Sequence, residues 1–436
     1  MKKIFRALLL LLSACAFAQT PIAHVVIIVK ENRSFDHMFG TFPGANGATT
    51  GLVSSGATGA TIPLAKATDS VIPDIDHSWR ASHAAIDNGK MDHFDLENNC
   101  GAATNYHCYS QYSQSQISSY WSYAQNYVLH DNFFSSQSGP SLPNHLYLIA
   151  STSANMINLL NGVLPGGHPN NWGCDADAGS YVDSLNPATG KTYRQFPCLD
   201  SATLGDILES AGLSWRYYAP SIGQAGYQWS AYDAINHIRN NSSEWTTHVV
   251  PVSQFITDAA SGNLPAVSWV TPPASLSEHP SSPMSKGMNW TVQQINAVMS
   301  GPDWPSTVIF VTWDDWGGFY DHVPPPLLDV FGSGMRVPLL IISPFVQPGT
   351  ICHDSATFDS LLAFVEHNWN LGPLTQRDAN ANDLFSCFNS TLAATPTATT
   401  AGPLLLGMVP EPKLTKARQK AIDQEITRDR VNDPDD

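Results

Sequence analysis

Short apolar runs, in which hydrophobic residues follow one another without polar alternation, constrain the fold of this chain more than any other feature. Strands covered by helices on both faces have this pattern, whereas strands with one solvent-exposed face alternate hydrophobic and polar residues. The runs are His24–Val29, Ala266–Val270, Thr307–Thr312 and Pro338–Ser343, with a weaker one at Ser214–Tyr218. Helical spacing of apolar residues occurs at 120–128, 142–150, 201–211, 290–299 and 358–368. This order predicts an α/β fold with a mostly parallel central sheet and crossover helices.

The chain has enough apolar material for one large domain around such a sheet. Of its 436 residues, 43% are hydrophobic, and they include 12 Trp, 14 Tyr and 18 Phe. That composition excludes a fully disordered chain. We expect one domain over 19–390, with insertions at 44–70 and 155–197 that are rich in small and polar residues. A Thr/Ala/Pro linker and a charged tail, expected to form a solvated helix, follow over 391–436.

The N-terminus has the parts of a bacterial secretory signal. Three basic residues precede an apolar stretch over 7–17, and Ala16-Phe17-Ala18 forms an A-x-A cleavage site. The apolar stretch is shorter than the roughly 20 residues that span a bilayer, and no later segment is long enough, so we predict no transmembrane segment. Residues 1–18 are therefore predicted to be a signal peptide and the mature protein to be secreted or periplasmic. The alternative is a lipoprotein box that ends at Cys15.

The cysteines that remain after removal of residues 1–18 are even in number, as expected of disulfides in an exported protein. Many pairings are open, and we expect the sequential one. It joins Cys100 to Cys108, Cys174 to Cys198 and Cys352 to Cys387. A zinc site is the competing interpretation, but the sequence contains no C-x-x-C pair.

The charge balance argues against nucleic acid as a partner. The formal net charge is −16, from 21 basic and 37 acidic residues. A surface of this sign repels phosphate backbones. The sequence carries no signal for an oligomeric state.

Oxygen-bearing side chains follow two of the predicted strands. Glu31 and Asn32 come after the first strand, and Asp314 and Asp315 after the strand at Thr307–Thr312. Ligands of open α/β sheets bind beyond the carboxyl ends of the strands, so these four side chains converge if the strands are neighbours. Carboxylate and amide oxygens suit Mg²⁺, Ca²⁺ or Mn²⁺, and such a site also takes zinc or iron. The alternative is that strand ends are simply polar.

Ser141 lies just before a helical stretch with Pro143 in its first turn, where an N-cap is expected. A serine at a helix N-terminus near a cation is also placed to act as a nucleophile, because both stabilise its alkoxide and the phosphoryl oxygens that it attacks. The sequence has no G-x-S-x-G, no G-x-x-x-x-G-K-[ST] and no G-x-G-x-x-G. An α/β-hydrolase elbow and nucleotide-cradling loops are therefore disfavoured.

Two histidines in polar loops, His77 and His279, are candidates for further roles. A single loop histidine is usually a surface residue. Phosphoryl transfer with one cation, however, needs additional donors for the non-bridging oxygens and a proton for the leaving group, and histidine supplies both.

Four motifs together resemble the bacterial phosphoesterase family, which contains phospholipases C and related acid phosphatases. They are H-V-V-I-I-V-K-E-N-R-S-F-D-H at 24–37, S-G-P-S-L-P-N at 138–144, S-E-H-P at 277–280 and W-D-D-W-G-G-F-Y-D-H-V at 313–323. The likeness spans about residues 22 to 370. It implies a three-layer α/β/α core similar to that of alkaline phosphatases and arylsulfatases, a bound divalent metal ion, and a Ser or Thr nucleophile that forms a covalent phospho-enzyme.

The resemblance also implies roles for residues in the motifs. The implied metal ligands are Glu31, Asn32, Asp314 and Asp315, and the implied nucleophile is Ser141. His77 and His279 are implied to bind phosphate or to act as acid and base. Asn144 and His322 are further candidates for contact with substrate. The sequence departs from the usual pattern at four positions, with Asp315 where Glu is common, His145 for Arg, Trp316 for His and Ser281 for Pro.

The sequence thus predicts a secreted, metal-dependent phosphoesterase that acts through a covalent phosphoserine. The chain length and negative charge favour a soluble enzyme similar to acid phosphatases. The alternative is a phospholipase C that cleaves phosphodiesters of the phosphatidylcholine type. A sulfatase is disfavoured by the absence of C-x-P-x-R, and a non-catalytic glycan-binding protein would leave the four motifs unexplained.

Overall fold

An eight-stranded sheet forms the centre of the protein in the computed structural model, which describes residues 20–54, 60–161, 172–389 and 401–428. The predicted signal peptide and Cys15 lie outside these residues. The strand order is β12-β11-β13-β1-β14-β15-β6-β16. In that order, the strands are Val249–Pro251, Trp215–Ala219, Val267–Val270, His24–Lys30, Thr307–Trp313, Leu339–Ile342, Val128–His130 and Thr350–Cys352.

The sheet is mostly parallel, as predicted. Only β15 runs against its neighbours, pairing antiparallel with both β14 and β6. All five predicted strands are present, as β1, β11, β13, β14 and β15. The other three strands have three residues each, too few to show a pattern in the sequence.

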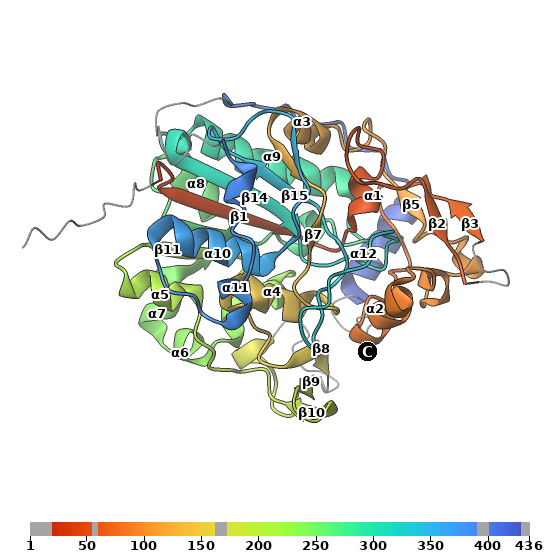
Figure 1. Cartoon of the computed structure of the whole chain (residues 1–436), viewed down its shortest axis with the longest axis horizontal. Coiled ribbons are helices and arrows are strands. Elements are labelled where there is room, and N and C mark those ends of the chain that lie inside the picture. The colour runs from red at the N-terminus through yellow and green to blue at the C-terminus, as the bar shows by residue number, and fades with distance from the viewer. Residues whose placement is uncertain (1–19, 55–59, 162–171, 390–400, 429–436) are drawn as a thin grey trace, which may run out of the picture.

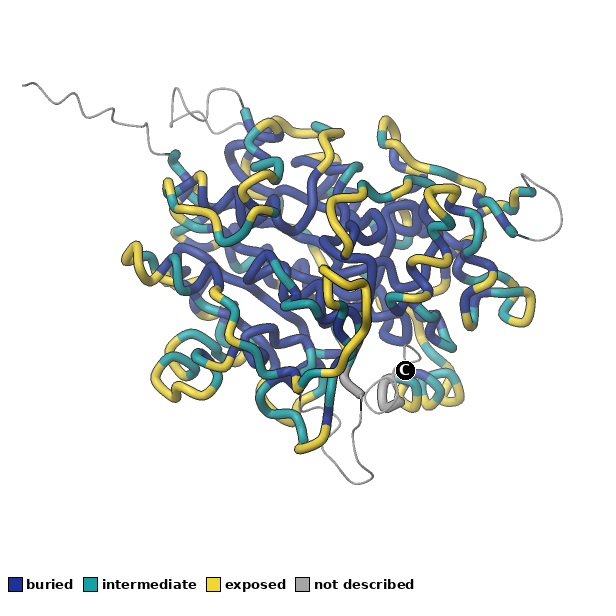
Figure 2. The backbone as a smooth tube through the Cα atoms, turned by 60° about the horizontal axis from the view of Figure 1, so that its bottom comes forward, coloured by how far each residue is buried: buried dark blue, intermediate teal, exposed yellow. Residues whose placement is uncertain are grey.

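Helices cover both faces of the sheet (Figure 1), so the predicted layered α/β architecture is confirmed. One layer contains α3, α8 and α9, and the other contains α4, α5 and α10. The helices, α1 to α12, are Phe35–Phe39, Trp79–Ile86, Ser118–Asn126, Ser141–Ala150, Leu204–Ser210, Asn236–Arg239, Ser242–His248, Gln254–Ala260, Met284–Ser300, Phe358–Trp369, Gln376–Ala379 and Lys416–Arg428. Figure 2 shows the buried sheet and inner helices surrounded by exposed loops.

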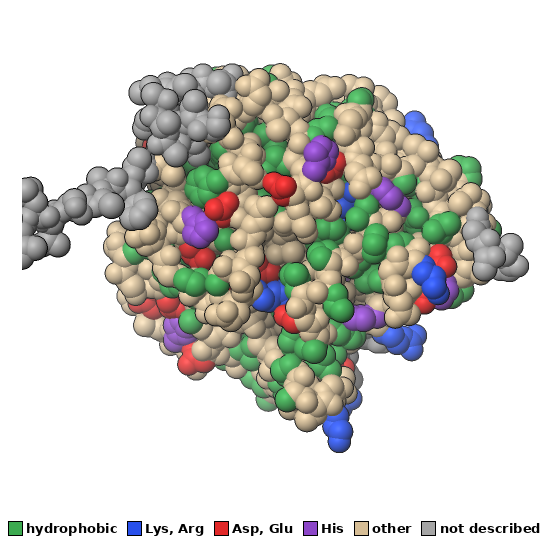
Figure 3. Space-filling model, viewed as in Figure 1, with side chains coloured by type: hydrophobic (Ala, Val, Ile, Leu, Met, Phe, Trp, Pro, Cys, Tyr) green, Lys and Arg blue, Asp and Glu red, His purple; other side chains and the backbone are tan. Residues whose placement is uncertain are grey.

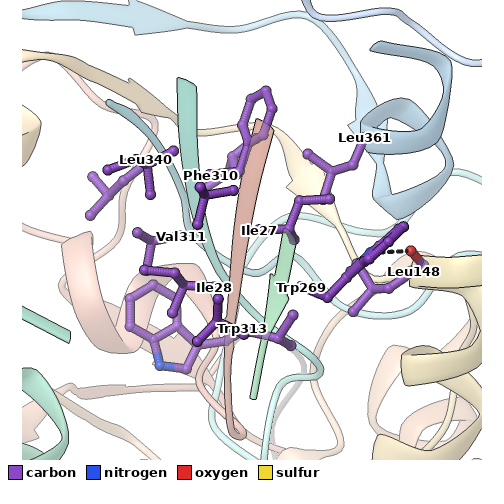
Figure 4. Close-up of a cluster of buried hydrophobic side chains, with 14 of the residues drawn as sticks. Ile27, Ile28, Leu148, Trp269, Phe310, Val311, Trp313, Leu340 and Leu361 are labelled. Atoms are coloured by element: carbon purple, nitrogen blue, oxygen red, sulfur yellow. Dashed lines mark hydrogen bonds between the residues drawn. The ribbon is translucent and has the colours of Figure 1, made fainter. Parts of the chain in front are cut away.

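The core lies on both faces of β1 and its neighbours because successive side chains of a strand point to opposite faces. In Figure 4, Ile27 points toward Leu361 of α10, and Ile28 toward the opposite side. Every residue from Val25 to Val29 is buried. Trp269 of β13 donates its indole N–H to the Leu148 carbonyl of α4 at 2.9 Å, which ties the sheet to this helix.

The two predicted insertions carry small sheets of their own. Residues 44–70 contain β2 (Thr50–Leu52), β3 (Thr61–Pro63) and β4 (Ala65–Lys66), and β4 pairs with β5 (Ser110–Gln111). The second insertion contains a three-stranded sheet of β8 (Met156–Asn161), β9 (Tyr181–Asn186) and β10 (Lys191–Gln195). A two-residue pair, β7 (Phe133–Phe134) with β17 (Ala356–Thr357), completes the strands described.

Disulfides join Cys100 to Cys108, Cys174 to Cys198 and Cys352 to Cys387, which confirms the sequential pairing.

The described part of the C-terminal tail lies against the domain. The carbonyl of Leu406 accepts a hydrogen bond from Asn296 of α9 at 2.8 Å, and Arg418 of α12 donates to the Ser70 carbonyl at 2.9 Å. The division of the chain at residue 390 stays a prediction. Among the described residues, no helix combines the length and the hydropathy needed to cross a membrane.

Candidate active site

The register of β1 places the predicted metal ligands side by side. β1 pairs in parallel with β14, and Lys30 lies opposite Trp313, so Glu31 and Asp314 leave the two strands at the same level. On the other side of β1, the strand β13 leads into the loop that carries His279, and the Glu31 N–H donates to the Ser277 carbonyl at 2.9 Å. Three adjacent strands thus bring together segments that are far apart in the sequence.

The four oxygen-bearing residues, Glu31, Asn32, Asp314 and Asp315, are fully buried and close to one another. The backbone N–H of Asn32 donates to Asp314 Oδ1 at 2.9 Å. Asn32 has a positive φ of 60°, and Gly317 packs so closely against its carbonyl that a Cβ at position 317 would overlap it. Glycine at 317 is therefore required for this approach.

The orientation of the Asn32 amide suits a cation. Its side-chain oxygen lies 3.0 Å from Asp314 Oδ1 and 3.2 Å from Glu31 Oε2, so an amide oxygen and two carboxyl oxygens face one another. Without a cation, the reversed amide would hydrogen-bond better. With ligand distances of about 2.1 Å, as for Mg²⁺, adjacent oxygens lie about 3 Å apart, which matches these separations. The donor set, which consists of hard oxygens, therefore fits a divalent metal ion.

Burial and mutual repulsion also raise the pKa values of these carboxyl groups. Burial, followed by the charge of Glu31, raises the pKa of Asp314 to about 7. Burial, followed by the charge of Asp314, raises the pKa of Asp315 to about 7. Burial likewise raises the pKa of Glu31 well above its ordinary value. Several buried carboxylates without a counter-charge are costly, and a bound cation would offset that cost.

Ser141 points into this group of oxygens. It is the first residue of α4, and Pro140 occupies the N-cap position, so the expectation that Ser141 caps the helix is wrong. Because its side chain makes no capping hydrogen bond, Ser141 Oγ is available to the site. It lies 3.3 Å from Asp315 Oδ2 and 3.4 Å from Asn32 Oδ1.

Asn144 holds the loop that presents Ser141. Its side-chain oxygen accepts from the Gln137 N–H at 3.0 Å. Its amide nitrogen lies 3.1–3.2 Å from the carbonyls of Gln137, Gly139 and Pro140. These contacts indicate that Asn144 positions the loop that presents Ser141. Its predicted contact with substrate stays a prediction.

The two predicted histidines border the same site. His77 donates from Nδ1 to the Ile75 carbonyl at 2.6 Å, which leaves Nε2 toward Asn32, 2.9 Å from the amide nitrogen. The His279 ring lies 6.1 Å from that of His77, and its Nε2 is 3.6 Å from Asp74 Oδ2. Burial and the charges of His77 and Arg33 lower the pKa of His279 well below its ordinary value.

His145 is a site residue that the sequence did not identify. Its Nε2 lies 3.0 Å from Glu31 Oε1 and 3.6 Å from Asp314 Oδ2, and the three residues can present ligand atoms to one point. Burial lowers its pKa, which favours the neutral ring that binds metals. The spacing of residues 141 and 145 places both on one face of a helix, which predicts that His145 lies near Ser141 but not that it contacts Glu31.

His322 lies in a neighbouring group of charges. Its Nδ1 is 2.6 Å from Asp36 Oδ2, and its Nε2 is 3.2 Å from Asn46 Oδ1. Arg336 binds both Asp36 and Asp321 in the same group. The described contacts of His322 do not include Ser141 or the four oxygen-bearing residues, and its predicted contact with substrate stays a prediction.

Comparison with known proteins finds relatives that are named as phospholipases C. Phospholipase C B of Mycobacterium tuberculosis is 26% identical over 86% of this chain and 79% of the relative. The non-hemolytic phospholipase C of Burkholderia pseudomallei is 27% identical over 84% of this chain and 59% of the relative. Among solved structures, murine ectonucleotide pyrophosphatase/phosphodiesterase 5 is 11% identical over 62% of this chain and 94% of that chain, with a TM-score of 0.35.

The relatives, together with the site, define a hydrolase of phosphoric esters. A family model described as Phosphoesterase family matches residues 22–372. The chain belongs to this family, as its four motifs predicted.

Proposed function

We propose that the protein cleaves phosphodiesters of the phospholipid head-group type and that Ser141 forms a covalent phosphoserine ester during the reaction. The position of Ser141 carries this proposal. Ser141 is the first residue of α4, and its Oγ makes no capping hydrogen bond to the helix but lies within 3.4 Å of Asp315 and Asn32. The N-terminus of a ten-residue helix also favours an anionic phosphoryl group at this point.

Glu31, Asn32, Asp314 and Asp315 would hold a divalent metal ion, with His145 beside them. When bound, such an ion supplies Lewis-acid stabilisation of the charge that develops on the phosphoryl oxygens.

The protein side chains perform the remaining steps. Ser141 Oγ attacks phosphorus, and its proton passes to Asp315 Oδ2. The bond from phosphorus to the leaving oxygen breaks as His77, which enters the reaction as the imidazolium with a second proton on Nε2, gives that proton to the leaving oxygen. A water molecule then attacks the phosphoserine ester and gives a proton to His77, while Asp315 returns the first proton to Ser141. His279, neutral because of its lowered pKa, donates a hydrogen bond to a non-bridging oxygen.

The names of the relatives favour phosphodiesters as substrates. The acid phosphatase predicted from length and charge remains the second candidate. The products separate the two, because a phospholipase C releases phosphocholine from p-nitrophenyl phosphorylcholine, whereas a phosphatase releases inorganic phosphate from p-nitrophenyl phosphate.

The mechanism is tested with Ser141→Ala and Glu31→Gln, and with Ser122→Ala on α3 as a matched control. We expect Ser141→Ala to lose at least about a thousandfold in kcat, as nucleophile removal does elsewhere. Mass spectrometry of acid-quenched wild type should show the adduct on Ser141. Wild-type turnover in Ser141→Ala would exclude this nucleophile, and an unchanged metal content in Glu31→Gln would exclude this ligand.

We also propose that residues 1–18 are removed on export. N-terminal sequencing of the exported protein should begin at Gln19, whereas a lipid-modified Cys15 would indicate the lipoprotein alternative.

A further inference from the structure

An apolar loop projects from the protein after the motif that carries Asp314 and Asp315. In this loop, residues 323–331, Leu327 is 86% exposed, Leu328 53% and Val330 51%. Elsewhere in the described chain at most two large exposed hydrophobic side chains occur within four positions, as at Leu405 and Met408, whereas here there are three. A concentration of exposed apolar side chains marks an interaction site more often than single ones do.

The base of the loop is fixed beside the candidate active site. The carbonyl of Phe331 accepts from the Ser138 N–H at 3.2 Å, and the carbonyl of Ser333 accepts from Ser138 Oγ at 2.9 Å. Ser138 belongs to the segment that presents Ser141. The Phe331 ring also lies 6.4 Å from that of Trp79, two residues after His77. The loop therefore stands between the nucleophile segment and the segment that carries His77.

The loop is also stiff and nearly uncharged. Three consecutive prolines, at 324–326, restrict its backbone on the way to Leu327. It contains no Lys or Arg, and its only acidic residue, Asp329, pairs with Arg377 at 3.0 Å. In Figure 1 the connection from β14 to β15 crosses the viewed face between α4 and α2, and hydrophobic side chains gather on this part of the surface in Figure 3.

We propose that residues 323–331 dock the protein on a zwitterionic phospholipid surface by inserting Leu327, Leu328 and Val330 among the acyl chains. This inference rests on the proposed function, because it gives a buried site access to a substrate held in a lipid surface; Ser141 is only 4% exposed. Apolar side chains bind to the surface of a membrane because insertion buries their apolar area. Anionic lipids add attraction only where Lys or Arg is present. The net charge of −16 and the absence of basic residues in the loop therefore favour a zwitterionic surface.

The binding test uses Ser141→Ala protein, which leaves the lipid intact, in flotation with phosphatidylcholine vesicles. We expect L327S/L328S to reduce partitioning about tenfold or more, because two exposed leucines no longer enter the acyl region. The matched control, L405S/M408S, removes side chains that are 56% and 47% exposed from the segment held by α9, and it should leave partitioning unchanged. Addition of phosphatidylglycerol should not increase binding.

The activity test compares vesicles with soluble p-nitrophenyl phosphorylcholine. L327S/L328S should lose turnover of vesicles by a similar factor and keep turnover of the soluble ester, which also shows that the variant is folded. If it is not folded, Val330→Ser is used in the same two assays and should show a smaller loss of the same kind.

Equal vesicle binding by wild type and L327S/L328S would overturn the inference, as would a loss that L405S/M408S shares. A dimer in sedimentation velocity that L327S/L328S dissociates would also overturn it, because the loop would then bind a second copy. If wild type hydrolyses neither substrate but floats with vesicles through Leu327 and Leu328, the proposed function fails and the docking surface stands.

Discussion

Asn32 shows how single residues depart from ordinary preferences at the site. Its φ is 60°, and Glu278, beside His279, has a φ of 76°. Residues other than glycine adopt this region uncommonly, and such cases cluster where surrounding structure holds a functional side chain in place. At Asn32 the holding contacts come from Gly317 and from Asp314.

His145 gives a prediction at this scale. Because its Nε2 lies 3.0 Å from Glu31 Oε1, we expect His145→Gln to weaken metal binding about tenfold to a hundredfold. The measurement is a calorimetric titration of chelator-treated protein with a divalent metal. His367→Gln, on the outer part of α10, is the control and should bind the metal as wild type does. Equal affinity in His145→Gln would place this histidine outside the metal's surroundings.

The convergence of Glu31, Asn32, Asp314 and Asp315 could be predicted from the sequence, because each pair directly follows a recognisable strand. The sequence identifies Ser141 as a candidate but predicts the wrong position in the helix, since a serine just before a proline in the first turn usually occupies the N-cap position. The sequence does not predict a site role for His145, because this residue differs from the Arg that is common in the family at its position. Its proximity to Glu31 depends on how α4 packs, which the sequence does not express.

At the scale of elements, the strand positions were predictable and their directions were not. β15 has the continuous apolar pattern of its parallel neighbours because it is also covered on both faces, and burial does not depend on strand direction. The three-residue strands β6, β12 and β16 could not be predicted, because they exist through pairing with the sheet.

Asp233, in the short helix Ala231–Ala234, gives a prediction about pH at this scale. Burial, followed by the charge of Asp175, raises its pKa to about 8. The folded protein therefore keeps a proton that the unfolded chain releases near pH 4, and the resulting stability is lost as the pH rises toward 8. This group alone should lower the free energy of unfolding by about 1.4 kcal/mol per pH unit between about pH 5 and 7.

Asp233→Asn should remove this contribution, about 1.4 kcal/mol per pH unit, from the pH dependence of the free energy of unfolding, since the amide does not titrate. Urea unfolding at several pH values measures it. Asp183→Asn, on β9, is the control. Identical slopes for Asp233→Asn and wild type would show that Asp233 is ionised in the folded protein.

At the scale of the whole molecule, the metal should stabilise the fold. Asp314 and Asp315, whose pKa values burial raises to about 7, are ionised at pH 8, and their charges repel each other when no cation is present. We expect a saturating metal, at about a thousand times its Kd, to stabilise the protein by about 4 kcal/mol. Calorimetry of chelator-treated protein with Mg²⁺, Ca²⁺, Mn²⁺ or Zn²⁺ added back measures this, and an unchanged Tm with every metal would contradict it.

The pairing of β1 with β14 also decides when the site can form during synthesis of the chain. Asn32 and Asp314, which meet in the site, are 282 residues apart in the chain, and the segment that carries Ser141 lies between them. A ribosome makes Asn32 early and Asp314 late, so a growing chain lacks part of the site until residue 315 has been made. We therefore expect a nascent chain that ends before residue 314 to be inactive, because β1 does not yet have β14 to pair with.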